Sequence, residues 1–168
     1  MDDMTQLKDW SFAIYEQFEV PTDDGFVEKL RNANVHILTI TEDWCGDAML
    51  NNPIIRKVSE AANVDIRTVL RDADTELIDR HLTNGGRSIP IYLVLNEAGD
   101  VVAKWGPRAP ELQQLVMDGR AQLPGQDDPQ YEEAQKQFYT NLRTRYAEDA
   151  TLWTYVYESF KAEVLGKV

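Results

Sequence analysis

The chain has 168 residues, of which 43% are hydrophobic and 27% are charged, with one cysteine and a formal net charge of −12 at pH 7. Its length suits a single domain, its composition excludes collagen-like and largely disordered classes, and its apolar runs are too short to span a bilayer. Acidity spread along the whole chain disfavours binding to nucleic acid, and a lone cysteine excludes an internal disulfide.

The start of the chain and its few metal-ligating residues support two further expectations. Residues 1–6 carry neither a basic cluster nor an apolar core, so we expect no secretory signal and a cytoplasmic location. Two histidines and one cysteine are too few for a typical Cys/His zinc site, so we expect no bound metal.

The first segment, residues 1–32, is predicted to be helical. Residues 4–18 place apolar side chains at a spacing that approximates one helix face. A break rich in Pro, Asp and Gly follows at 20–25, and a second, short helix is predicted from Phe26.

The middle of the chain, residues 33–120, alternates strand and helix patterns. Strands are predicted at 35–40, 64–70, 91–95 and 101–105, and helices at 49–62, 74–82 and 110–120. The turn at 96–100 makes the last two strands a hairpin, and the first two strands should be parallel because a helix joins them. This predicts an α/β fold with a βαβαββα core and a central mixed sheet.

Residues 127–168 are predicted to form a C-terminal helical extension. A break at 123–129 ends with Asp128-Pro129, a favourable helix start, and a second helix is predicted over 151–164. About 40 residues are marginal for an independent domain, so we expect this pair of helices to pack on the core or on a partner.

Cys45 is the candidate catalytic residue. It lies between the first core strand and the next helix, where free backbone N–H groups and the helix dipole stabilise a thiolate, the reactive form of cysteine. Gly46 lets another backbone approach, and Trp44 can shield the sulfur. The structural alternative is a small buried core cysteine. Because Asp47 and other nearby acids oppose the dipole, we expect a thiol pKa near the ordinary value of about 8.5.

Four features in chain order resemble the thioredoxin family. They are Trp44-Cys45-Gly46 at the strand-to-helix junction, Pro53 in the following helix, Ile89-Pro90 before the third strand, and Lys104-Trp105-Gly106 at the end of the last strand. The resemblance covers residues 33–120 and is strongest to a bacterial subgroup built around Trp-Cys-Gly-Asp-Cys. It implies a thioredoxin-like fold, with a cis peptide bond between Ile89 and Pro90 that brings the Ile89 backbone beside Cys45.

The chain departs from the family pattern at two positions. Ala48 stands where the family has its resolving cysteine, and Thr39 stands where it has a buried acid. A dithiol cycle needs one thiol to attack and another to resolve, so Cys45 could form a mixed disulfide but could not release it alone. The resemblance therefore implies a monothiol protein without a bound cofactor, acting on a protein or small-thiol partner. Glutathione or another low-molecular-weight thiol would then be the co-substrate.

Other functions stay open on the sequence alone. The first alternative is a redox-inactive binding module that recognises an extended peptide beside Pro90; an oligomeric role for the helical extensions and a glutathione-transferase-like enzyme are more remote. Arg87 is a candidate for binding a substrate carboxylate, against a structural ion pair, and Arg108 has the same two interpretations. Asp47 is expected to complement the helix dipole, against a role in tuning Cys45 or positioning a proton. Glu42 and Asp43 are expected to be solvated loop acids, against a role in partner choice.

Overall fold

The structure, a computed structural model, describes residues 4–168, so the first three residues of the predicted N-terminal segment lie outside it. Its elements, in chain order, are α1 (Lys8–Gln17), α2 (Phe26–Asn32), β1 (His36–Thr41), α3 (Gly46–Ala62), β2 (Ile66–Leu70), α4 (Thr75–Asp79), β3 (Ile91–Leu95), β4 (Val101–Trp105), α5 (Pro110–Ala121), α6 (Tyr131–Glu148) and α7 (Ala150–Leu165). No helix within this part of the chain is long and apolar enough to cross a membrane.

The four strands form one mixed sheet in the order β2-β1-β3-β4. β1 and β2 are parallel and are connected through α3, whereas β3 is antiparallel to both β1 and β4. The predicted α/β fold with its βαβαββα core and mixed sheet is confirmed. β3 is central and almost fully buried, while β2 forms an edge of the sheet and is largely exposed.

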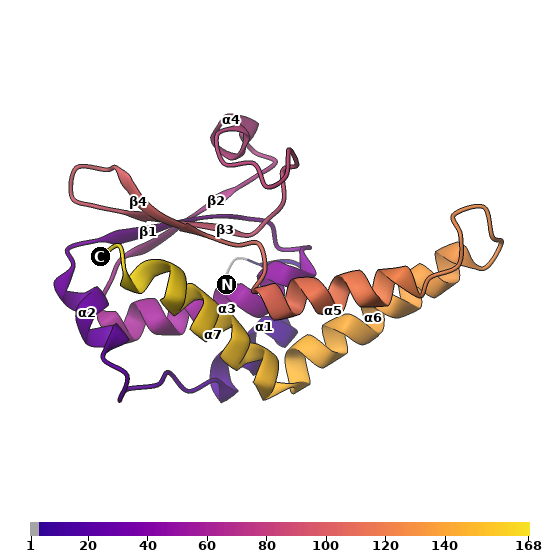
Figure 1. The fold of residues 1–168 in the computed structure, drawn as a ribbon, viewed down its shortest axis with the longest axis horizontal. Coiled ribbons are helices and arrows are strands. Elements are labelled where there is room, and N and C mark those ends of the chain that lie inside the picture. Colours follow the sequence, from indigo (N-terminus) through magenta and orange to yellow (C-terminus); the bar gives the residue numbers. More distant parts are fainter. Residues whose placement is uncertain (1–3) are drawn as a thin grey trace.

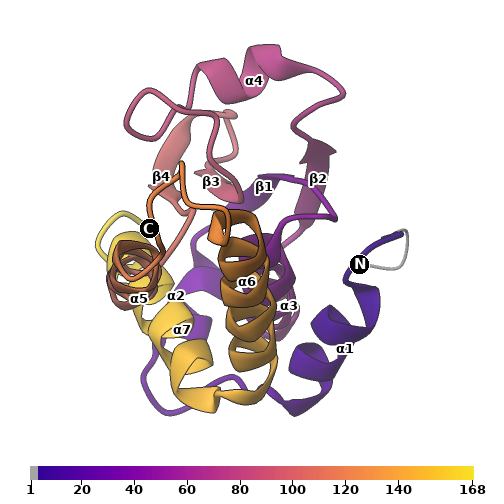
Figure 2. The ribbon, with the colours of Figure 1, turned by 90° about the vertical axis from the view of Figure 1, so that its right-hand side faces the viewer.

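Helices cover the two faces of the sheet unequally. The short α4 lies alone on one face, and the remaining helices gather on the other, as the two perpendicular views show (Figure 1, Figure 2). The larger apolar core is on the many-helix face and includes side chains of α1, α2, α3, α5, α6 and α7. The smaller core lies on the α4 side and contains Cys45.

Several predicted boundaries were wrong by a few residues. The helix predicted from Met49 begins at Gly46, because Cys45 in an extended conformation (φ −80°, ψ 122°) caps it, whereas the apolar periodicity starts one turn later. The helix predicted from Asp128 begins at Tyr131, because the Asp128 carboxylate accepts the N–H of Gln130 within a turn.

Four more elements are shorter than predicted or shifted along the chain. The N-terminal helix begins at Lys8, since Leu7 has a left-handed φ of 54°. β1 is displaced by one residue, β2 starts at Ile66 rather than at residue 64, and α4 ends at Asp79 rather than at residue 82. Apolar pattern alone places a helix or strand end only to within a few residues.

The C-terminal helix α7 packs into the larger core. Phe160 is fully buried and makes edge-to-face contacts with Phe26 and Trp105, at ring-centroid distances of 6.0 and 5.8 Å. The Trp105 indole N–H donates a hydrogen bond of 2.8 Å to the Ser159 hydroxyl. β4 and α2 are therefore held together through α7.

Asp24, in the loop before α2, ties that loop to α7. Its carboxylate accepts hydrogen bonds from the Tyr157 hydroxyl (2.7 Å), the Lys161 ammonium (3.1 Å) and the Phe26 N–H (3.0 Å). Burial alone would raise the pKa of Asp24, but the hydrogen bonds from Tyr157 and Phe26 outweigh it and lower the pKa.

We expect Asp24→Asn to destabilise the protein at pH 7 by about 1.5–3 kcal/mol, the usual range for hydrogen bonds to a charged group. Because the folded-state pKa is depressed, the carboxylate stabilises the fold above its unfolded pKa, and this contribution is lost as the pH falls through the folded pKa. Urea unfolding of the natural chain and Asp24→Asn measures the difference in their free energies of unfolding, which should be smaller at pH 3 than at pH 7. A difference that is equal or larger at pH 3 would contradict this role of Asp24.

Candidate active site around Cys45

Cys45 sits at the N-terminus of α3 and is buried, with 8% of its surface exposed. Its thiol donates a hydrogen bond to the Ile89 carbonyl, with the sulfur 3.5 Å from the oxygen. Around it lie apolar side chains from both neighbouring core strands and from α4, including Ile40, Ile78 and Ile91. The sulfur is thus part of the smaller core and does not lie in an open loop.

Two proline loops meet beside Cys45. The Ile89–Pro90 peptide bond is cis, which is the geometry implied by the resemblance, and Gly106–Pro107 at the end of β4 is also cis. Gly106 has a φ of +114°, and a Cβ there would lie 2.2 Å from the Pro90 carbonyl oxygen. Only glycine fits this position, so Gly106 lets the two loops pack against each other.

The pKa of Cys45 differs from the sequence-based expectation. Burial of the sulfur, followed by the negative charge of Asp47, raises the pKa to about 11. The N–H groups of Ala48 and Asp47 and the charge of Arg108 favour the thiolate, but they do not compensate. The prediction of a thiol pKa near 8.5 was wrong, because burial has the largest effect on this pKa and the sequence does not show burial.

Asp47 belongs to a half-buried polar network that reaches the C-terminal extension. Arg108 binds it through two nitrogens, at 2.9 Å and 2.7 Å, and the Tyr146 hydroxyl of α6 donates to it at 3.0 Å. Arg108 also donates to the Gln113 side chain at 2.8 Å. The side chains of Asp47 and Arg108 are only 13% and 16% exposed, and Arg108 forms an ion pair here, while carboxylate binding by Arg108 stays a prediction.

α6 also closes over the start of α3. A Cβ added at Gly46 would lie 3.5 Å from the Cγ of Arg143. Arg143 and Tyr146 come from the C-terminal extension, about 100 residues after the cysteine motif, and sequence reasoning did not assign either to the site. The aromatic spacing of this helix predicts only a packing face, so the sequence pattern did not indicate that the helix contacts the first turn of α3.

Trp44 stands on the exposed side of the site, 43% exposed. The guanidinium of Arg71 lies over its ring, 5.1 Å from the centroid. Arg71 also pairs with Asp72 at 2.8 Å and donates to the Arg87 carbonyl at 3.1 Å. Arg71 therefore links the aromatic residue next to Cys45 to the loop that precedes Ile89.

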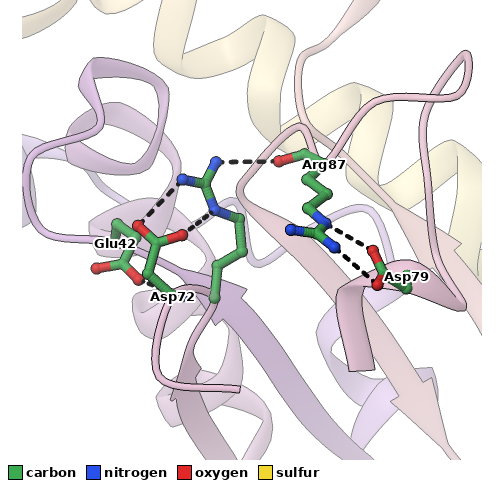
Figure 3. Close-up of polar contacts among 5 residues, drawn as sticks. Glu42, Asp72, Asp79 and Arg87 are labelled. Atoms are coloured by element: carbon green, nitrogen blue, oxygen red, sulfur yellow. Dashed lines mark hydrogen bonds and ion pairs between the residues drawn. The ribbon is translucent and has the colours of Figure 1, made fainter. Parts of the chain in front are cut away.

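The two acids before Trp44 are not simply solvated. Glu42 is buried and its carboxylate accepts the Asp72 N–H at 2.7 Å, which corrects the expectation of a solvated loop acid (Figure 3). Asp43 accepts hydrogen bonds from both the N–H and the hydroxyl of Thr5, at 2.8 and 2.6 Å. Each carboxylate therefore binds a segment that is distant in the sequence, at Asp72 for Glu42 and at Thr5 for Asp43.

The structure brings most of the predicted site residues together and leaves one apart. Cys45, Ala48 and Ile89 share the smaller core, and Gly46 and Asp47 form the first turn of α3. Arg87 instead makes a two-pronged ion pair with Asp79, at 2.6 and 2.9 Å (Figure 3). Substrate binding by Arg87 stays a prediction. Within residues 4–168, no group of three or more His, Cys, Asp or Glu side chains is placed to hold a metal ion.

We expect Asp47→Asn to increase the alkylation rate of Cys45 at pH 8 severalfold, because losing the carboxylate charge lowers the pKa of the thiol. The substitution removes the charge that opposes the thiolate and leaves Arg108, which favours it. The rate is measured with iodoacetamide, and Asp118→Asn, on the exposed side of α5, serves as the control. An unchanged or slower rate in Asp47→Asn would contradict the assigned role of Asp47.

Comparisons with known proteins agree with this fold. The profile of the family described as Thioredoxin matches residues 1–124. A crystal structure of an HIV epitope scaffold superposes with a TM-score of 0.62 at 17% identity, over 99% of this chain and 89% of the other. A Pseudomonas aeruginosa protein of unknown function gives a TM-score of 0.52 at 17% identity, over 89% and 83%.

No curated protein sequence matches the chain. The family match includes the N-terminal helices as well as the core, so it covers more of the chain than the sequence motifs do. Because they are only 17% identical to this chain, the two solved structures are evidence for the fold alone. With the family profile matching residues 1–124, the chain belongs to the thioredoxin family.

Proposed function

We propose that this thioredoxin-fold protein binds an extended segment of a protein partner beside Trp44 and Pro90, and that it does not turn over disulfides at neutral pH. One observation carries the proposal: the Cys45 thiol is buried and donates to the Ile89 carbonyl, while its neighbour Trp44 is exposed. The aromatic side chain, and not the sulfur, is what a partner meets first.

The thiol chemistry supports binding over turnover. With a pKa of about 11, only about one Cys45 side chain in ten thousand is a thiolate at pH 7. Ala48, at the position of a resolving cysteine, is fully buried and offers no second thiol. Both halves of a dithiol cycle are therefore disfavoured.

The surface beside the sulfur has the features of a recognition site for an extended peptide. Ile89 lies two residues before Ile91, the first residue of β3 that pairs with β1, so its backbone N–H lies outside the sheet ladder, while its side chain is buried and its carbonyl accepts the Cys45 thiol. An added strand can pair with such a backbone, and an exposed tryptophan is a frequent anchor in protein interfaces. The Arg71 guanidinium, itself paired with Asp72, packs over the Trp44 ring and supports it from one side.

A random peptide library displayed on phage, screened under reducing conditions, tests this function. We expect enriched peptides to bind the natural protein and Cys45→Ala with similar affinity and to bind Trp44→Ala at least tenfold more weakly. Trp10→Ala, a variant of another exposed tryptophan, is the matched control. Failure to enrich any peptide, or enrichment that depends on Cys45 and not on Trp44, would overturn the proposal.

A monothiol oxidoreductase is the second candidate, because the N–H groups of Asp47 and Ala48 both favour a thiolate at Cys45. In this function, the Cys45 thiolate attacks a disulfide, forms a mixed disulfide and releases one thiolate. Glutathione or a similar thiol then resolves it. Mass spectrometry of protein purified without reductant tests this candidate, since a thiol adduct on Cys45 supports it and an unmodified Cys45 speaks against it.

A further inference from the structure

A cavity of about 530 Å³ lies at the β2 edge of the sheet, on the face that carries α3. Its floor is formed by β1 and β2, α3 supplies Asn52 and Arg56, and the segment at Met4 and Thr5 supplies a further wall. Volumes of 300–1,000 Å³ are typical of sites for small organic molecules. Cys45 packs in the core on the other face of the sheet and does not line this cavity, whereas Glu42 and Asp43, the two acids before Trp44, do.

Strand register explains why the floor is rich in hydroxyl groups. Thr39 of β1 is opposite Thr68 of β2 on one side and Tyr92 of β3 on the other, so the three side chains form a row across one face of the sheet. Thr41 lies two residues further along β1 on the same face. All four residues line the cavity.

One of these hydroxyl groups has no partner. The Thr41 hydroxyl accepts from the side-chain Nδ2 of Asn52 at 3.2 Å, and the Tyr92 hydroxyl donates to the side-chain Oδ1 of Asn52. Thr39 is only 2% exposed, and its hydroxyl oxygen has no hydrogen-bond partner within residues 4–168. A buried hydroxyl without a partner destabilises the protein, so this group favours a ligand that can hydrogen bond to it.

The charged groups around the cavity are already paired. Asp43 holds Thr5, Arg56 makes an ion pair of 2.8 Å with Glu60, and the Glu42 carboxylate accepts the Asp72 N–H. An ionic ligand would have to compete with these partners, whereas a neutral hydrogen-bonding group would not. Ile66 and Leu70 of β2 supply an apolar wall, and Leu70 is 52% exposed.

We propose that this cavity binds a small neutral amphipathic molecule whose amide or alcohol head hydrogen bonds to the Thr39 hydroxyl and whose apolar body lies against Ile66 and Leu70. The bound head satisfies the buried hydroxyl, and the body covers an exposed part of the edge strand. This binding is independent of the sulfur of Cys45 and of the partner surface at Trp44.

The test is a titration of the ¹⁵N-labelled full chain, followed by amide NMR shifts, with three probes of one chain length: hexanamide, hexanoate and hexylammonium. We expect hexanamide to give saturable shifts at residues 39–42 and 66–70, with the two ions binding at least tenfold more weakly. Shifts that do not saturate, that spread over the surface, or that are equal for all three probes would overturn the proposal and indicate a solvent-filled cavity.

Variants locate the interaction. We expect Thr39→Val, which replaces the hydroxyl by a methyl group, to weaken hexanamide binding about tenfold, while Thr39→Ser retains it. Thr68→Phe, on the exposed edge strand, should fill the cavity and abolish binding without altering Thr39. Thr154→Val, on the exposed side of α7, is the control and should bind as the natural chain does. Unchanged affinity for hexanamide in Thr39→Val, or in Thr68→Phe, would overturn the proposal. Having two variants keeps the test valid if one of them folds poorly.

Discussion

Phe160→Ala is expected to destabilise the protein by about 3–5 kcal/mol, the range for truncating a buried aromatic side chain. Phe160 is fully buried, and its ring contacts Phe26, Tyr92 and Trp105, with centroids 5.8 to 6.4 Å away. Removing the ring leaves a cavity where α7 meets the sheet and α2. Since domains are stable by only about 5–15 kcal/mol, this single change would remove a large share of the total.

Urea unfolding monitored by far-UV circular dichroism measures this loss. Met117→Ala, at a position of α5 that is 54% exposed, is the control and should change the free energy of unfolding by about 0.5 kcal/mol or less. A loss below about 1 kcal/mol in Phe160→Ala would contradict the packing of α7 into the main core.

Alkylation of folded Cys45 is expected to be about 300-fold slower at pH 7 than alkylation of the same chain in urea. The thiolate is the nucleophile, and a pKa of about 11 lies about 2.5 units above the ordinary thiol value of about 8.5. Because the folded pKa is raised, the thiol stays protonated as the pH rises through neutrality. The rate should therefore increase about tenfold per pH unit from pH 7 to 10.

Iodoacetamide labelling followed by mass spectrometry measures the alkylation rate of Cys45 against pH in the folded and in the urea-unfolded chain. The unfolded chain is the internal control, because its thiol has lost both the burial and the fixed position of Asp47. A folded-state rate that levels off below pH 9 would contradict the assigned environment of Cys45.

The sequence predicted the strands and their succession along the chain because local patterns determine them. The apolar runs of β3 and β4 flank a turn rich in Asn, Gly and Asp, and Pro110 opens α5 at the predicted residue. The motif positions of Cys45 and Ile89 also placed them close together. These features depend on neighbouring residues or on a family resemblance, and both are visible in a single sequence.

The environment of Cys45 could not be predicted in the same way. Its pKa depends first on burial, and the Asp47 network that acts on it includes Tyr146, 99 residues from Asp47. No short-range pattern encodes such a contact. The cis bond at Gly106–Pro107 also had no sequence signal, since most X–Pro bonds are trans.

Reduction of 2-hydroxyethyl disulfide at pH 7, with and without glutathione, tests most directly whether Cys45 is a nucleophile in the folded protein. The proteins compared are the natural chain, Cys45→Ser and Ala48→Cys, the last restoring a second thiol. We expect the natural chain and Cys45→Ser to give the same background rate under both conditions, with any gain confined to Ala48→Cys. Glutathione-dependent activity of the natural chain that disappears in Cys45→Ser would contradict a binding function and establish monothiol chemistry.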